Sequence, residues 1–265
     1  MKKLDILGKI YTNNRGEDCE VVSYLNSKSV VVKFKNSGYV GTYPKGNLDK
    51  GRFLDPMSPT VYGVGFLGKE QRDFVLGAKH EMAMDAWRHI LRRCYCPNFQ
   101  AKHPAYVGCS VDERWHNFSV FEAWILSKDQ FNFSDDNKLS SRWNIDKDIL
   151  VKGNKIYSPE TCCLVPQEVN SLLAAPNAKG KVTGLPLGVH LACQQKNGVV
   201  RYSSKVNTGN RNSNHLGTYD TVEEAFQAYK KAKETYIKEV AERWKGKIDD
   251  KVYKALLEWK IEITD

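Results

Sequence analysis

The sequence lacks the long apolar runs of a membrane protein, because no stretch approaches the roughly 20 residues that a membrane-spanning helix needs. Its N-terminus carries lysines but not the apolar segment of a secretory signal peptide. The cysteine count is seven, an odd number, which favours reduced thiols over a disulfide framework. We therefore expect a cytoplasmic protein that does not engage membranes.

The Cys-x-x-Cys pairs typical of structural zinc sites are also missing. Cys94 and Cys96 have one residue between them, and Cys162 and Cys163 are adjacent. His103 and His116 lie near them in the sequence, but these spacings fit zinc poorly. The sequence predicts buried thiols and no zinc.

What is present is an excess of positive charge on a chain of moderate length. The chain has 265 residues, 41% of them hydrophobic, which is enough for two or three small domains. Its formal net charge is +9. An excess of basic residues indicates an acidic partner, and nucleic acid fits better than a membrane surface.

Residues 1–66 favour a small domain of short strands. Apolar or alternating segments occupy 21–24, 29–34 and 39–42, and turn residues rich in Asn, Ser and Gly separate them. Strands this short and evenly spaced predict a small β barrel. A Pro- and Gly-rich segment, 55–66, follows as a linker.

Residues 80–95 predict an amphipathic helix, because Ala83, Trp87, Ile90 and Cys94 recur at helical spacing. A second short helix is expected around the aromatic residues of 115–124. Arginine side chains on the first helix could bind phosphate oxygens with both arms of their planar forks. The candidates are Arg88, Arg92 and Arg93.

Residues 139–173 predict a strand, a polar loop, a second strand and a short helix. The first strand is expected to hold Trp143, Ile145 and Ile149, and the loop to turn at 153–154. The second strand is expected over 161–165, with Pro166 in the first turn of the helix. The first strand carries two acids and the helix carries an amide. Hard oxygen ligands of this kind suit Mg²⁺ or Mn²⁺. They are Asp146, Asp148 and Asn170.

This segment resembles the ββα-metal finger of HNH nucleases, in the variant found in phage homing endonucleases. The motifs that carry the resemblance are Ile-Asp-Lys-Asp-Ile at 145–149, Gly-Asn-Lys-Ile-Tyr-Ser-Pro-Glu-Thr-Cys at 153–162, and Val-Pro-Gln-Glu-Val-Asn at 165–170. The resemblance implies that Asp146 and Asn170 bind the metal. Thr161 stands where many relatives place the middle Asn of the motif.

Lys147 departs from the family, because it stands where an ordinary HNH site has the histidine that activates water. A lysine is charged at neutral pH unless burial or a neighbouring cation changes this, and two flanking acids favour the charged form. Other residues would then have to act as the base, with Tyr157 and Asp148 as candidates, or the site is inactive. The candidate catalytic residues are Lys147, Asp148, Tyr157 and Thr161.

Residues 185–265 predict three strands and two helices, after a linker at 176–184. The strands are expected at 188–194, 199–206 and 214–219, and the Asn-Gly pair at 197–198 is a strong hairpin signal. Thr221 and Glu224 form a capping box at the start of the first helix, and a second helix is expected over 250–260.

This unit resembles the DNA-binding domain of plant ethylene-response factors, which phage nucleases also carry. The motifs are Leu-Pro-Leu-Gly-Val at 185–189, Arg-Tyr-Ser-Ser-Lys-Val at 201–206 and His-Leu-Gly-Thr-Tyr-Asp-Thr at 215–221. The resemblance implies that the sheet enters the major groove while the helix packs behind it. Alternation along the strands turns Tyr202, Ser204 and Val206 towards the helix. The residues expected to contact DNA are His190, Lys196, Arg201, Ser203, Lys205, Arg211 and His215, although relatives often have arginine in place of Ser203.

Together these patterns predict an α+β protein with several domains: a β barrel (1–66), a metal finger with flanking helices (67–175) and a sheet-on-helix DNA-binding domain (185–265). The resemblance implies a phage endonuclease that cuts double-stranded DNA with Mg²⁺ or Mn²⁺ inside the host bacterium. One site would nick a single strand, and a homodimer is one way to cut both. The alternatives are an inactive relative that acts as a DNA-binding repressor or interference factor, and a protein that counters a host defence.

Overall fold

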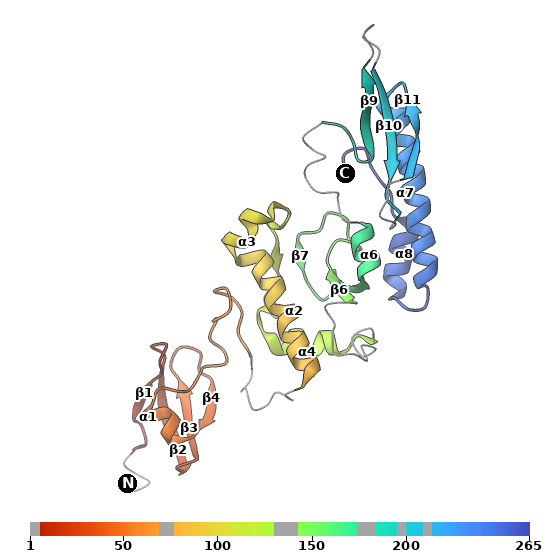
Figure 1. Cartoon of the computed structure of the whole chain (residues 1–265). Coiled ribbons are helices and arrows are strands. Elements are labelled where there is room, and N and C mark those ends of the chain that lie inside the picture. The colour runs from red at the N-terminus through yellow and green to blue at the C-terminus, as the bar shows by residue number, and fades with distance from the viewer. Residues whose placement is uncertain (1–5, 69–76, 130–142, 174–183, 195–199, 209–213) are drawn as a thin grey trace. The chain divides into compact units, whose positions relative to one another are not determined.

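A computed structural model describes residues 6–68, 77–129, 143–173, 184–194, 200–208 and 214–265 (Figure 1). The chain divides into two compact units. The first comprises Met1–Lys128 with Lys155–Ser158, and the second comprises Asp129–Asn154 with Pro159–Asp265. Both helices and several small sheets are present, which confirms the expected mixed α and β class.

The first unit begins with a four-stranded antiparallel sheet in the order β1-β2-β3-β4. The expected barrel is wrong, because no pairing within the described residues joins the edge strands β1 and β4. After β4 the chain turns into a short helix, whose Leu48 joins the core instead of a further strand. Phe53 then packs against Phe34, with ring centroids 5.9 Å apart. The elements are β1 (Ile10–Thr12), β2 (Asp18–Asn26), β3 (Ser29–Phe34), β4 (Val40–Tyr43) and α1 (Lys45–Asp49).

A second core of the first unit forms between two helices, as the sequence predicts. These are α2 (Ala78–Tyr95) and α4 (Phe118–Leu126), with a short 3-10 helix, η4 (Glu113–His116), before α4. The indole Nε1 of Trp87 donates to the Trp115 carbonyl at 2.6 Å. The apolar face of α2 is buried as predicted, together with the aromatic residues around α4: Ala83, Trp87, Ile90, Cys94, Trp115, Phe118 and Phe121.

The first unit also takes a strand from the middle of the predicted finger. Residues Ile156–Tyr157 form β7, which pairs in parallel with β5 (Ser110–Val111). Between α2 and β5 lie α3 (Pro97–Lys102) and the 3-10 helix η3 (Pro104–Tyr106). The loop expected between the two finger strands therefore contributes to a different unit from the strands themselves.

In the second unit the finger strands are shorter than predicted. β6 (Trp143–Asp146) pairs antiparallel with β8 (Cys163–Pro166), and Asp146 lies opposite Cys163. Ile149 lies beyond the end of β6, in a bend. The helix α6 (Gln167–Leu172) starts one residue later than expected, because Pro166 ends β8 and caps the helix in an extended conformation.

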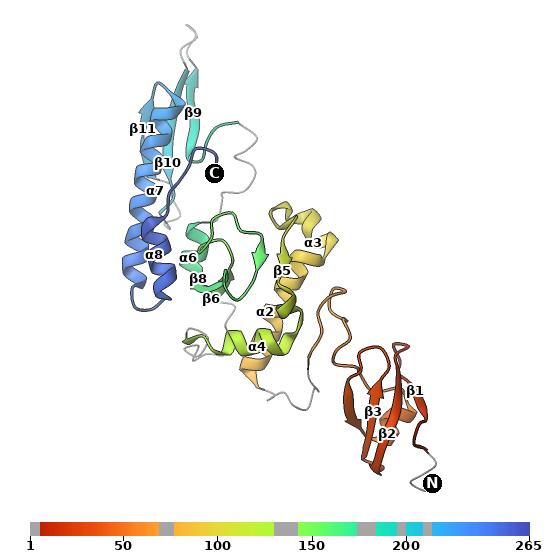
Figure 2. The ribbon, with the colours of Figure 1, turned by 180° about the vertical axis from the view of Figure 1, so that it is seen from behind.

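The C-terminal elements follow the prediction closely. Strands β9 (Val189–Gln194), β10 (Val200–Val206) and β11 (Asn214–Tyr219) form an antiparallel sheet in the order β11-β10-β9. Thr221 and Glu224 make the predicted capping box on α7 (Val222–Trp244), which packs on one face of this sheet (Figure 2). The last helix, α8 (Asp250–Glu258), packs against α7.

One hydrophobic core runs through the whole second unit. It joins buried residues of the finger to buried residues of the sheet domain, so the two predicted domains share an interior. Buried members from the finger are Ile149, Cys163, Val165, Val169 and Leu172, and those from the sheet domain include Val189, Val206, Phe226, Ile237, Val240, Val252 and Leu256.

Candidate functional site

Asp146 lies where β6 ends and the chain bends. Its Oδ1 accepts hydrogen bonds from the backbone N–H groups of Asp148 at 2.7 Å and Ile149 at 2.9 Å. Burial raises the pKa of the Asp146 carboxyl above its ordinary value, and the two N–H donors act in the opposite direction. The side chain thus holds the local bend with one oxygen, and a ligand would bind the other, Oδ2.

Lys147 is turned into the loop that follows. Its Nζ donates to Asp148 Oδ1 at 2.6 Å and to the Asn154 carbonyl at 2.8 Å, and its side chain is 7% exposed. The Asn154 amide donates back to the Lys147 carbonyl at 2.8 Å. An ammonium group has only donors, so this arrangement supports loop closure rather than proton abstraction.

Asn170 lies half-buried on α6, and this helix contacts both β6 and β8. Thr161 is half-buried just before β8. A carboxylate and an amide are hard oxygen donors, and Mg²⁺ is usually held by one or two such groups while it keeps several waters. The described residues include no cluster of three or more His, Cys, Asp or Glu side chains able to hold a metal. An Asp–Asn pair contains only one side chain of these four kinds, so that absence does not bear on it.

Tyr157 belongs to the first unit and is buried there on β7, with 2% of its surface exposed. Burial raises the pKa of its phenol far above the ordinary value, although Arg93 beside it acts in the opposite direction. A phenol in this state does not take up protons at neutral pH. Tyr157 therefore has the environment of a core residue.

The face of the three-stranded sheet away from α7 carries a short row of polar residues. Ser203 on the central strand lies between His190 on β9 and Thr218 on β11. Ser203 is 6% exposed because its neighbours flank it, and its hydroxyl donates to the His190 carbonyl at 3.5 Å. Alternation predicts His190 and Ser203 on this face, and the cross-strand register agrees. Thr218 lies on this face as well, which the sequence pattern did not predict. Only the cross-strand register places it opposite Ser203.

Two cations of the sheet differ in their surroundings. Lys205 is exposed and lies opposite His215, which is exposed as well. Arg201 lies near the start of the central strand, with its Nε 2.9 Å from Asp220 Oδ1. Register shifts next to Arg201 and Lys205 interrupt the simple alternation of β10. The other two predicted cations, Lys196 and Arg211, lie outside the described residues.

In the first unit two of the three predicted arginines of α2, Arg92 and Arg93, stand over aromatic rings. Arg88 and Arg92 are exposed, and the Arg92 guanidinium lies 4.8 Å from the Phe99 ring centroid. Arg93 is half-buried, 5.4 Å from the Tyr106 ring centroid. Aromatic support of this kind holds a guanidinium in place. Sequence spacing identified the arginines but not the rings of α3 and η3 that support them.

No protein family, curated protein or solved structure matches this chain. The described part of the chain has no helix that combines the length and the apolar character needed to cross a bilayer.

Proposed function

We propose that the chain is a DNA endonuclease that hydrolyses phosphodiester bonds with the help of a divalent metal. The observation that carries this proposal is a strand pair followed by a helix, β6–β8–α6, with an acid at the strand end and an amide on the helix. The same packed unit contains a sheet with one face on α7 and polar and basic residues on the other.

Asp146 and Asn170 would hold Mg²⁺ or Mn²⁺. A metal ion bound there supplies positive charge that stabilises the phosphate in the transition state and the leaving oxygen. The bend at Asp146 supports this role, because backbone N–H groups fix one carboxylate oxygen and so orient the other. A ligand whose rotamer is fixed in advance costs less free energy to organise when the metal binds.

Among the catalytic candidates, Asp148 is best suited to accept the proton of the attacking water. Its side chain is 46% exposed, whereas Lys147 is buried against it and Tyr157 is buried in the first unit. Lys147 then has a positioning role, since its ion pair fixes the Asp148 carboxylate. Thr161 contributes at most a weak hydrogen bond, because a hydroxyl is a poor base.

Duplex DNA would be read by the open sheet face and held by backbone contacts. His190 and Lys205 are exposed on that face, where lysine is suited to phosphate and histidine to base edges, and Ser203 lies between His190 and Thr218 with only 6% of its surface exposed. The Asp220 carboxylate holds Arg201 near the start of the central strand, from where its guanidinium can turn to phosphate or to guanine. Arg88 and Arg92 give the first unit a second set of phosphate contacts.

The engaged state of Lys147 also favours a second candidate, a DNA-binding repressor with an inactive finger. In HNH nucleases the corresponding histidine activates water, and a lysine that donates to Asp148 and Asn154 cannot do so. The repressor binds DNA equally well with or without metal, whereas the nuclease needs metal for turnover. Divalent metal therefore separates the two candidates.

The test compares the wild type with Asp146→Asn on phage DNA, in Mg²⁺, in Mn²⁺ and in chelator. The asparagine keeps an oxygen at Oδ1 for the backbone bonds of the bend and removes the charge that a metal needs, so folding is preserved. Asp49→Asn, at an exposed residue of α1 that pairs with Lys45, is the matched control. We expect metal-dependent cuts at few positions, lost in Asp146→Asn and kept in Asp49→Asn. Tight binding without cleavage in either metal would reject the nuclease and leave the repressor.

A further inference from the structure

The finger and the sheet domain are joined by two polar contacts as well as by their common core. The first contact involves Glu168, in the first turn of α6. Its carboxylate accepts hydrogen bonds from Arg243 Nη2 at 2.5 Å and from Trp244 Nε1 at 2.7 Å, both from the last turn of α7. The Trp244 ring also packs edge-on against Trp143 of β6, with centroids 6.1 Å apart.

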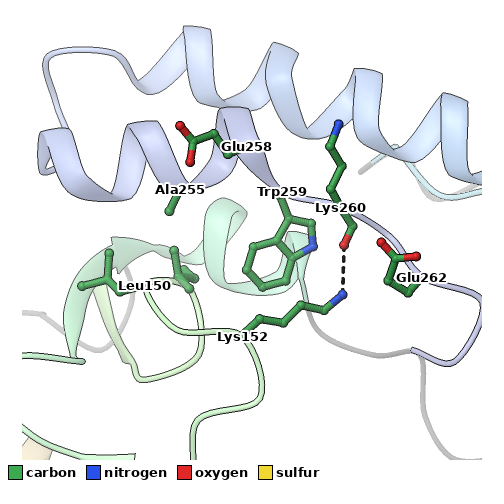
Figure 3. Close-up of a pocket in the computed structure, with 8 residues that line it drawn as sticks. Leu150, Lys152, Ala255, Glu258, Trp259, Lys260 and Glu262 are labelled. Carbon is green, nitrogen blue, oxygen red and sulfur yellow. Dashed lines mark hydrogen bonds between the residues drawn. The ribbon is translucent and has the colours of Figure 1, made fainter.

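The second contact lies at the other helix of the sheet domain (Figure 3). Lys152, from the finger loop, extends beside the Trp259 ring, with its Nζ 5.5 Å from the ring centroid. The same Nζ donates to the Lys260 carbonyl at 2.9 Å and to Asp265 Oδ2 at 2.8 Å. Lys152, Trp259 and Lys260 border a pocket between the finger loop and the end of α8, lined also by Leu150 and Ala255.

Two separate contacts around a packed core restrict both sliding and rotation. The core alone resists separation, because close-packed interiors do not deform continuously. Directional hydrogen bonds at two places add resistance to rotation about the core. Glu168 is also two residues before Asn170 on α6, so the contact with α7 acts directly on the helix that carries a proposed metal ligand.

We propose that Glu168 and Lys152 are positioning residues that fix the finger relative to the DNA-reading sheet. A consequence, which rests on the proposed nuclease function, is that cleavage occurs at a fixed offset from the bound sequence. A nuclease joined to its reader by a free tether would instead cut over a range of offsets. The two contacts therefore fix the offset between the bound sequence and the position of cleavage.

The coupling is tested first without cleavage, by pulsed electron resonance between two nitroxide labels. The labels are placed by Val151→Cys in the finger and Lys238→Cys on α7, both exposed positions, after Cys96 and Cys193 are replaced by serine. We expect a narrow distance distribution, and a clearly broader one when Glu168→Ala and Lys152→Ala are added. Equal widths in both proteins would overturn the proposal.

The consequence is tested by mapping cuts on duplex DNA selected from a random-sequence library by binding in chelator. In Glu168→Ala with Lys152→Ala, the share of cuts at the main position should fall about two- to fivefold, the factor expected for ion pairs of this exposure. Glu168→Gln, which keeps the acceptor oxygen, should restore much of the offset, and Glu239→Ala on exposed α7 should leave it unchanged. The footprint of the sheet in chelator should stay the same in every variant.

The outcomes separate the two proposals. Cuts confined to one offset in all variants would reject the positioning role and keep the nuclease. Binding without any cleavage by the wild type would reject the nuclease, and the label distances would still decide whether Glu168 and Lys152 fix the finger.

Discussion

The finger and the sheet domain of the second unit achieve stability in different ways. The sheet domain has a 23-residue helix on three adjacent strands, so most of its contacts join elements that follow each other in the chain. The finger has four-residue strands and a six-residue helix, too few to close a core alone. Its buried residues complete the core of the sheet domain instead. The proposed chemistry therefore lies on the part that is stable only through its neighbour.

The largest effect on stability is expected when one glycine of the sheet domain and one glycine of the finger are each replaced by alanine. Gly188 and Gly153 have nearly the same φ, +74° and +76°, but a Cβ at Gly188 would lie 2.0 Å from Tyr229 Cδ2, whereas one at Gly153 meets nothing within 4 Å. Gly188→Ala should lower the unfolding free energy by about 3 kcal/mol or more, because backbone strain and overpacking add. Gly153→Ala should cost about 1–2 kcal/mol, from the left-handed backbone alone. Urea unfolding measures both, and equal losses would contradict the close packing on Tyr229.

The common core can be tested by a substitution in the finger. Val169→Ala on α6, where the side chain is 0% exposed, should cost about 2 kcal/mol, because it leaves a cavity. If finger and sheet domain share one core, hydrogen exchange should accelerate in α7 as well as in α6. Val151→Ala, at an exposed finger position, should change stability by less than about 0.5 kcal/mol. Acceleration confined to α6 would show that the two parts unfold separately.

The sheet face should contribute to DNA binding without affecting the finger. Lys205→Ala removes one exposed cation from that face, so affinity for duplex DNA should fall about three- to tenfold at moderate salt. The slope of log affinity against log salt should also decrease by about one. Lys238→Ala, an exposed lysine on α7, is the control, and fluorescence anisotropy is the measurement. Equal losses in the two variants would indicate a general charge effect rather than a binding face.

The smallest effect concerns pH. Burial raises the pKa of Glu168, but the hydrogen bonds from Trp244 and Arg243 outweigh it and hold that pKa below its ordinary value. A depressed carboxyl pKa contributes stability above the unfolded-state pKa, and this stability is lost as pH falls through the folded-state pKa. The wild type should exceed Glu168→Gln in stability near neutral pH by less than about 1 kcal/mol, since the pair is partly exposed. The gap should close in acid below the ordinary glutamate pKa, as melting temperatures over pH would show, and a constant gap would contradict the ion pair.

Local sequence signals predicted the parts that depend on neighbours along the chain. The capping box of Thr221 with Glu224 located the start of α7, and the spacing of Ala83, Trp87 and Ile90 located the core face of α2. The barrel was wrong because strand count and spacing do not determine whether two edges meet. The lengths of the predicted strands did not indicate that the chain forms the helix α1 after β4 instead of a further strand.

The candidate site could be predicted only in part, for a related reason. Motif positions placed Asp146 on a strand and Asn170 on a helix, since both depend on residues close in the chain, but the strand was expected to continue to Ile149 and ends at Asp146 instead. The partner of Lys147 across the loop, Asn154, and the partners of Glu168 on α7 are set by tertiary contacts. No spacing rule connects Glu168 with Arg243, which is 75 residues away.

The short strand β7 affects the order in which this protein can fold during synthesis. The chain leaves the first unit at Lys128, returns for Lys155–Ser158, and leaves again. The partner of β5 therefore does not exist until the ribosome has already translated β6. The first unit must wait for its last strand while the first strand of the second is emerging. Translation thus overlaps the completion of one unit with the beginning of the other, and a product truncated after Lys128 lacks an element of the unit it otherwise contains.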